Sequence, residues 1–206
     1  KSILLKAQVD VLFIPDVKEI YPKESKMSLN FGSIETVMEG KFRPGHFSGV
    51  GLIVSKLFNI VSPDVAFFGQ KDLQQTAVIK KLNEELTFGI DIRIVPTVRN
   101  KEGLALSSRN KRLTGRQKIL APVLFQILND VKEKVLHEGN ISSAKDWGIK
   151  KVSEYGSEIE LEYLEIVDSN ELTDVENVSN HQEISLCIAA YLGEVRLIDN
   201  LFLISR

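Results

Sequence analysis

Asp64-Val-Ala-Phe-Phe-Gly69 and Ile90-Asp-Ile-Arg-Ile-Val-Pro96 are two short apolar runs, and an amphipathic segment at residues 73–86 lies between them. Short apolar runs bounded by turn residues are typical of strands that are buried in a parallel sheet. Two parallel strands need a long connection, and a helix of this length supplies it. The stretch from 64 to 96 therefore predicts a β-α-β unit with a right-handed crossover, and so an α/β fold.

The sequence before this unit predicts more of the same sheet. Val9-Asp-Val-Leu-Phe-Ile-Pro15 is almost continuously apolar, and we expect it to be a central strand. Residues 2–8 should be the end of a helix, and residues 16–40 should form a loop with one short strand. Residues 49–60 carry apolar side chains at helical spacing and stop before Ser62-Pro63, so we expect a crossover helix there.

The composition changes after Arg112, where two helical segments and three strands are predicted. The helices cover residues 114–137 and 141–155, and the strands cover residues 161–167, 183–192 and 195–203. Gly193-Glu194 supplies the tight turn of a hairpin between the last two strands. We therefore place a boundary near residue 110, between the α/β part and a small α+β part.

Composition and charge exclude several classes of protein. The chain has 206 residues, of which 43% are hydrophobic and 26% are charged, as in ordinary globular proteins. Its net charge of −2 gives no overall attraction to nucleic acid or to anionic membranes. The apolar runs are too short to cross a bilayer, so we expect a cytoplasmic protein. The single cysteine, Cys187, lies in an apolar stretch and is predicted to be a buried core thiol.

A first group of candidate site residues follows the strand that ends at Gly69, in Phe68-Gly-Gln-Lys-Asp-Leu-Gln-Gln75. Ligands of open parallel sheets bind at this edge. Gly69 lets a ligand approach the backbone, Lys71 offers an ammonium to phosphate at a helix start, and Asp72 could accept hydrogen bonds from ribose. A capping box is an equally good interpretation, in which Asp72 and Gln75 only satisfy backbone amides of the helix.

A second group lies in Arg99-Asn-Lys-Glu-Gly-Leu-Ala-Leu-Ser-Ser-Arg-Asn110, after the strand at 90–96 and therefore at the same edge. Gly103 gives this loop the freedom to close. Ser107, Ser108 and Arg109 supply two hydroxyls and a forked cation, which suit phosphate oxygens. For an isolated Ser-Ser-Arg, however, a polar turn in which a serine caps a helix is the more common structure.

A third segment, Arg43-Pro-Gly-His-Phe-Ser-Gly-Val50, places a cation and an imidazole just before the expected helix at 49–60. His46 would titrate near neutral pH, although a histidine between glycines is more often a structural hydrogen-bond donor. No second histidine or cysteine stands at ligand spacing, so the sequence predicts no built-in metal site.

Taken together, these motifs resemble the pantothenate synthetase family along the whole chain. The resemblance rests on segments that occur in this order: Glu39-Gly40, Arg43-Pro-Gly-His-Phe47, Phe68-Gly-Gln-Lys-Asp72, Gln74-Gln75, Leu104-Ala-Leu-Ser-Ser-Arg-Asn110 and Leu197-Ile-Asp-Asn200. It implies a Rossmann-like nucleotidyltransferase parallel sheet, incomplete at the N-terminus, in residues 1–110, which bind ATP and pantoate. Residues 111–206 would form a small α+β lid domain.

The resemblance also assigns roles to single residues. Gln75 is expected to hold pantoate, and Arg43 and His46 to support the site. Val98 would act through its backbone near adenine, and residues 106–109 would form a mobile phosphate loop. The expected ATP contacts are Gly69, Gln70, Lys71, Asp72, Val98, Leu106, Ser107, Ser108 and Arg109, and the expected catalytic residues are Lys71, Ser107, Ser108 and Arg109. The family more often has glutamate at the position of Gln70.

The implied activity is the ATP-dependent ligation of pantoate to β-alanine through a pantoyl-adenylate, by a homodimer that uses Mg²⁺. Nucleic acid and membranes are not expected as partners. The family's histidine-glycine-histidine motif and a first pantoate-binding glutamine would precede Lys1, so we expect either a further segment in the natural protein or a fragment that binds substrates poorly. Two rivals remain, namely another adenylate-forming nucleotidyltransferase and a noncatalytic nucleotide-binding module.

Overall fold

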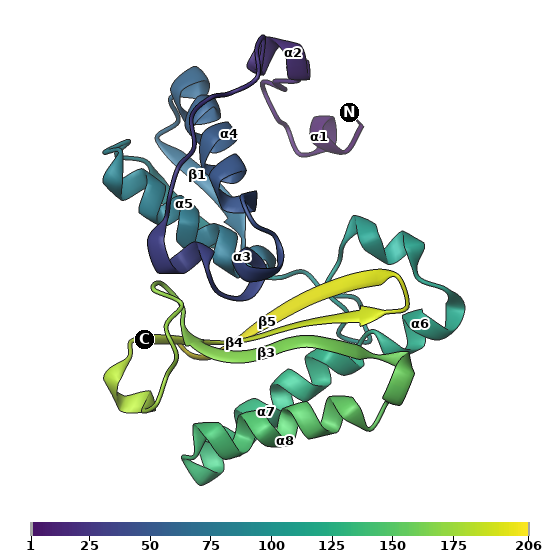
Figure 1. Ribbon diagram of the computed structural model, residues 1–206. Coiled ribbons are helices and arrows are strands. Elements are labelled where there is room, and N and C mark those ends of the chain that lie inside the picture. The colour runs from purple at the N-terminus through teal and green to yellow at the C-terminus, as the bar shows by residue number, and fades with distance from the viewer. Residues whose placement is uncertain (1, 206) are drawn as a thin grey trace.

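The computed structural model describes residues 2–205, which form an α/β part followed by an α+β part (Figure 1). The outermost residues of the two predicted domains, Lys1 and Arg206, lie outside this range. Within it, no helix is long and apolar enough to span a membrane.

The predicted β-α-β unit is confirmed. Strand β1 (Val65–Gly69) pairs in parallel with β2 (Asp91–Val95), and helix α5 (Leu73–Glu85) connects them. Helix α4 (His46–Val61) begins earlier than predicted and ends as expected, because Ser62 adopts a left-handed conformation before Pro63. The two helices pack together around a small core to which α4 contributes Val54 and Phe58 and α5 contributes Ile79 and Leu82.

The prediction of a central strand at residues 9–15 is wrong. These residues lie in a segment without regular structure, and the side chains of Val11 and Ile14 are 80% and 69% exposed. A strand requires the backbone of a neighbour, and in the described range the sheet that contains β1 has only β2 as its other strand. An apolar run predicts burial, but it does not supply the strand with which it must pair.

The region before α4 contains short helices. The helix expected at residues 2–8 is present, but the short strand expected within residues 16–40 is not, because the chain there folds into single helical turns. The elements are α1 (Ser2–Lys6), α2 (Val17–Ile20), η1 (Gly32–Glu35) and α3 (Met38–Phe42).

The α+β part consists of a three-stranded antiparallel sheet covered by helices on one face (Figure 1). The helix predicted over residues 114–137 is interrupted at Pro122, because proline lacks the amide hydrogen that would continue it. Gly193, with a φ of 57°, turns the chain between the last two strands as predicted. The elements are α6 (Gly115–Leu120), α7 (Val123–Glu138), α8 (Ile141–Ser153), β3 (Glu160–Asp168), β4 (Glu183–Leu192) and β5 (Val195–Ser205). Short 3₁₀ helices complete the described elements: η2 (Gln70–Asp72), η3 (Ser108–Arg112), η4 (Gly156–Glu158) and η5 (Val178–Asn180).

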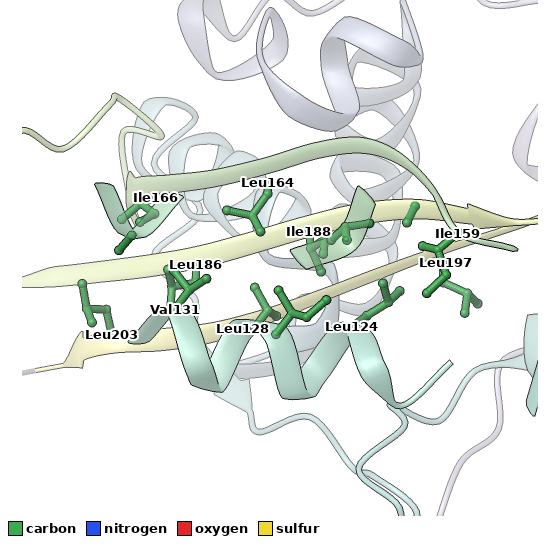
Figure 2. Close-up of a cluster of buried hydrophobic side chains, with 14 of the residues drawn as sticks. Leu124, Leu128, Val131, Ile159, Leu164, Ile166, Leu186, Ile188, Leu197 and Leu203 are labelled. Atoms are coloured by element: carbon green, nitrogen blue, oxygen red, sulfur yellow. The ribbon is translucent and has the colours of Figure 1, made fainter. Parts of the chain in front are cut away.

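The antiparallel sheet is buried on both faces, which explains why β4 is almost continuously apolar. On one face, Leu186 and Ile188 pack against Leu128 and Val131 of α7 (Figure 2). On the other face, Cys187 belongs to a cluster that also contains residues of α4 and α5. Cys187 is therefore a core thiol, as predicted, and burial raises its pKa far above the usual range. The sheet itself joins the two parts, while a division into domains at residue 110 stays a prediction.

Gly148 tests the packing of α8 on the sheet. A Cβ atom at Gly148 would lie 2.6 Å from Cγ2 of Val131, whose branched side chain has little freedom to move within a helix. We therefore expect Gly148→Ala to lower the free energy of unfolding by about 1–3 kcal/mol, measured by urea denaturation. Gly49→Ala is the matched control, because a Cβ there meets nothing within 4 Å and should stabilise α4 by up to ~1 kcal/mol. Stabilisation by both variants would contradict this packing.

Candidate active site

The candidate site lies where β1 and β2 end, as expected for a parallel sheet. Gly69 is the last residue of β1 and stands beside Val95, the last residue of β2. After Gly69, the chain forms η2, which contains Lys71, and then enters α5. After Val95, it reaches the segment that ends in η3. Both groups of predicted residues therefore begin at one edge of the sheet.

The first pocket at this edge contains five of the predicted residues. It is partly open to solvent. Its walls include side chains from both parts of the chain, among them Tyr163, Ile198 and Asn200 of the antiparallel sheet. The predicted residues that line it are Arg43, which follows α3, His46, the first residue of α4, Lys71, Asp72 and Gln75.

The second pocket adjoins the first and contains part of the Ser-Ser-Arg group. Ser107 and Arg109 line it, and Lys71 and Asp199 border both pockets. The remaining predicted residues line neither of these two pockets. They are Gly69 at the end of β1, Gln70 in η2, Ser108 in η3, and the exposed residues Val98 and Leu106. The backbone amide of Leu106 donates a 2.9 Å hydrogen bond to the carbonyl of Val98.

The capping-box interpretation of Asp72 and Gln75 is wrong. Asp72 precedes α5, but in the described chain its side chain makes no hydrogen bond to the helix start. Its carboxylate lies instead 3.6 Å from the ammonium of Lys71. The side chains of Asp72 and Gln75 therefore face the pocket rather than satisfying helix amides.

The capping interpretation of the Ser-Ser-Arg group is confirmed for one serine. The hydroxyl of Ser107 accepts a 3.2 Å hydrogen bond from the Arg109 amide and so caps η3. Ser108 is the exposed first residue of that helix. A cap fixes the direction of the loop without removing Arg109 from the pocket, so contact of these residues with phosphate stays a prediction.

The pKa of His46 lies below its ordinary value, which favours the neutral imidazole. Burial lowers the pKa of its imidazole, and the charge of Arg43 lowers it further, while Glu39 and Asp72 oppose this shift. Within the described residues its ring makes no hydrogen bond, so a role as a structural donor is not confirmed. A neutral imidazole can both donate and accept a hydrogen bond, which suits a pocket for a polar ligand.

The sequence did not reveal a buried ion network beside the first pocket. Arg196 of β5 donates to both carboxylate oxygens of Glu39, at 2.9 and 2.5 Å, and its Nε donates to Glu162 at 3.0 Å. The hydroxyl of Tyr163 donates to Glu39 at 3.0 Å, and Arg43 lies 3.6 Å from the same carboxylate. Glu39 belongs to the Glu39-Gly40 motif, and Arg196 directly precedes the motif that begins at Leu197. The two residues are 157 positions apart, so no local sequence pattern predicts that they form an ion pair.

Comparison with known proteins identifies the family to which the chain belongs. The family model for pantoate-beta-alanine ligase matches residues 1–202. The chain belongs to the pantoate-beta-alanine ligase family. This confirms the resemblance found in the sequence, and it excludes a nucleotidyltransferase of another family.

Relatives of the ligase agree with this assignment. The pantothenate synthetase of Cytophaga hutchinsonii is 43% identical over 204 residues, which are 98% of this chain and 72% of the relative. That of Porphyromonas gingivalis is 40% identical over 97% of this chain and 70% of its own length. The crystal structure of pantothenate synthetase from Thermus thermophilus superposes with a TM-score of 0.90 at 36% identity, over 98% of this chain and 73% of that one.

A further solved structure of the ligase family contains ligands. It is the pantoate-beta-alanine ligase of Francisella tularensis, complexed with beta-gamma ATP and beta-alanine. Its TM-score is 0.74 at 33% identity, over 98% of this chain and 68% of that one. These comparisons confirm an α/β fold of the pantothenate synthetase type for the chain.

A metal centre made only of protein ligands is not found in the described part of the ligase. Three carboxylates line the first pocket. Glu39 is bound by Arg196, and Asp199 is bound by Arg99. The carboxylate of Asp72 lies 3.6 Å from the ammonium of Lys71, and its side chain is half exposed. Its oxygens are therefore accessible to a cation that a ligand brings with it.

We expect the buried carboxylate of Glu39 to make the free energy of unfolding depend on pH. Burial alone would raise its pKa, but the hydrogen bonds and charge of Arg196, with help from Tyr163 and Arg43, hold the pKa below its ordinary value. A lowered pKa contributes stability above the unfolded value of about 4.3, and this contribution is lost as the pH falls through the folded value.

We expect Glu39→Gln to lower the free energy of unfolding by about 2–4 kcal/mol at pH 7, because Arg196 then loses a buried partner. The difference from wild type should shrink when urea denaturation is repeated below about pH 4. Glu158→Gln, which removes an exposed ion pair with Arg116, is the control and should change little at either pH. A difference at position 39 that does not vary with pH would show that Glu39 is not charged in the folded protein.

Proposed function

We propose that this chain catalyses the two-step ligation of its family: pantoate and ATP give pantoyl-adenylate and pyrophosphate, and β-alanine then displaces AMP to give pantothenate. The observation that carries this proposal is the position of Lys71, which borders both pockets. A cation at that junction can contact a phosphate in one pocket and a carboxylate in the other. The beta-gamma ATP and beta-alanine in the complex of the Francisella tularensis relative support the same assignment.

The first pocket is proposed to bind pantoate, which offers one carboxylate and two hydroxyls. The amide of Gln75 can donate to the carboxylate and accept from a hydroxyl. The imidazole of His46 can do the same in its neutral form, and Arg43 adds positive charge to the pocket. The apolar walls formed by Met38 and Leu73 suit the methyl groups of pantoate.

The second pocket is proposed to bind the triphosphate of ATP. Lys71, Ser107, Ser108 and Arg109 would contact the phosphates, since a forked cation and hydroxyls suit their oxygens. The ribose and adenine would extend along the end of the sheet. The residues proposed for that region are Gly69, Gln70, Asp72, Val98 and Leu106. A Cβ atom at Gly69 would meet nothing within 4 Å, so the backbone there is open to a ligand.

In the first step, a pantoate carboxylate oxygen attacks the α-phosphorus, and the bond from that phosphorus to the bridging oxygen of pyrophosphate breaks. Negative charge grows on the phosphate oxygens in this transition state. Lys71 and Arg109 stabilise that charge more strongly than they bind the ground state. Mg²⁺, which the resemblance to the family implies, would be held by the phosphates of ATP and would neutralise part of their charge. No protein nucleophile is needed.

We also propose, from the resemblance to the family, that the protein works as a homodimer in the cytoplasm. The small α+β part would serve as the lid of the site, and residues 106–109 as its mobile phosphate loop. The noncatalytic alternative, a module that binds nucleotide only, makes a different prediction for the wild-type protein.

Gln75→Ala and Lys71→Ala separate pantoate binding from stabilisation of the transition state. We expect Gln75→Ala to weaken pantoate binding at least ~10-fold and to leave ATP binding unchanged, because Gln75 lines the first pocket and not the second. Lys71→Ala should instead lower the rate of pyrophosphate release at least ~10-fold, because it removes a cation from the transition state. Binding is measured by isothermal titration calorimetry, and folding by the melting temperature.

Each variant serves as the control for the other. A folded Lys71→Ala protein with unchanged pyrophosphate release would overturn the assignment of Lys71. Wild-type protein that binds ATP but neither binds pantoate nor releases pyrophosphate would favour the noncatalytic module.

A further inference from the structure

The segment Leu197-Ile-Asp-Asn200 has no role in the reaction as described above, although its last two side chains are polar and buried. Asp199 is 6% exposed and Asn200 is 3% exposed. Both belong to β5 in the α+β part, but their side chains bind residues of the α/β part. Buried polar groups require partners, and the partners of these two lie in the segments proposed to bind ATP.

The side-chain amide of Asn200 holds the backbone at Lys71. Its Nδ2 donates to the carbonyl oxygens of Gln70 and Lys71, at 2.9 Å each. Its Oδ1 accepts a 3.2 Å hydrogen bond from Nε2 of Gln70. An asparagine amide has two N–H donors, and both are used on consecutive carbonyls of η2. The peptide between Gln70 and Lys71 therefore cannot shift without breaking buried hydrogen bonds.

Asp199 fixes Asn200 in turn. One carboxylate oxygen of Asp199 accepts from the backbone amide of Asn200 at 2.8 Å and from Arg99 at 2.8 Å, and the other oxygen accepts from Arg99 at 2.6 Å. Arg99 also donates to the carbonyl of Gly103 and stacks on the ring of Phe125 at 3.6 Å. Because both ends of the contact are anchored, Asn200 is a rigid support for η2.

We infer that Asn200 is a positioning residue of the ligase reaction, which keeps the ammonium of Lys71 at the junction of the two pockets. This inference rests on the catalytic role proposed for Lys71. A fixed charge stabilises a transition state only where its position is set in advance, and an error of ~1 Å can cost ~100-fold in rate. Asn200 supplies that fixation from the other part of the chain, through its two hydrogen bonds to the backbone of η2.

A double-mutant cycle tests this role. The rate of pyrophosphate release at saturating ATP and pantoate is measured for wild type, Asn200→Ala, Lys71→Ala and the double variant. We expect Asn200→Ala to lower the rate at least ~10-fold in the wild-type background. In the Lys71→Ala background it should lower the rate by less than ~2-fold, because the group that it positions is absent.

Two further variants separate positioning from loss of stability. Ser185→Ala removes the 2.8 Å hydrogen bond to Ser169 from a fully buried position and does not touch η2, so its rate should equal that of wild type. Asn200→Asp keeps the size of the side chain but turns an acceptor toward two carbonyl oxygens. It should lose as much rate as Asn200→Ala, and it replaces that variant if the alanine protein does not fold.

The outcomes distinguish this inference from the proposed function. An equal loss of rate in both backgrounds, or a wild-type rate for both Asn200 variants, would overturn the positioning role and leave the proposed function intact. A wild-type rate for Lys71→Ala would overturn the proposed function and this inference with it.

Discussion

The arrangement of the site depends on the hydrogen-bonded ion pairs that the guanidinium of Arg196 makes with Glu39 and Glu162. Glu39 belongs to α3, whereas Glu162 and Arg196 belong to the antiparallel sheet. Separating the two parts would break the hydrogen bonds between Arg196 and Glu39, whereas Glu162 would stay beside Arg196 in the sheet. A buried ion network stabilises a fold less reliably than an apolar core does. Because its hydrogen bonds are directional, it nevertheless restricts the orientation of α3 relative to the antiparallel sheet.

The two pockets follow from that restriction. The first pocket has α3, α4 and α5 on one side and β3 and β5 on the other, so neither part of the chain forms it alone. Asp199 and Asn200 extend the same interface to the segments that follow β1 and β2. Lys71 thus lies between the proposed pantoate and ATP pockets because polar contacts from β5 place its backbone there. The reaction needs a carboxylate and a phosphate within bonding distance, and a rigid junction supplies that proximity.

Local patterns in the sequence were sufficient for much of the fold. The β-α-β unit, the hairpin at Gly193 and the three antiparallel strands were predicted because apolar periodicity and turn residues act over a few positions. The run at residues 9–15 was mistaken for a strand because periodicity reports hydrophobicity and not the presence of a neighbouring strand. The pattern over residues 114–137 predicts one helix because its apolar spacing continues past Pro122, where the proline interrupts the helix.

For the site, the sequence predicted which segments gather but not how they are held. Parallel strands end at one edge, so the grouping of Lys71 with Arg109 followed from topology. The capping box at Asp72 could not be excluded by pattern alone, since it depends on the direction of a single side chain. The contacts of Arg196 and Asn200 join residues far apart in the sequence, which no local rule can pair.

The most direct test of this account is the relative orientation of the two parts in solution. Residual dipolar couplings of backbone amides in α5 and in β4 would be measured on the free protein. If the buried contacts of Arg196 and Asn200 hold the parts together, one alignment tensor will fit both sets of couplings. Two tensors of different magnitude would show that the parts move independently before substrate binds, and would contradict the account.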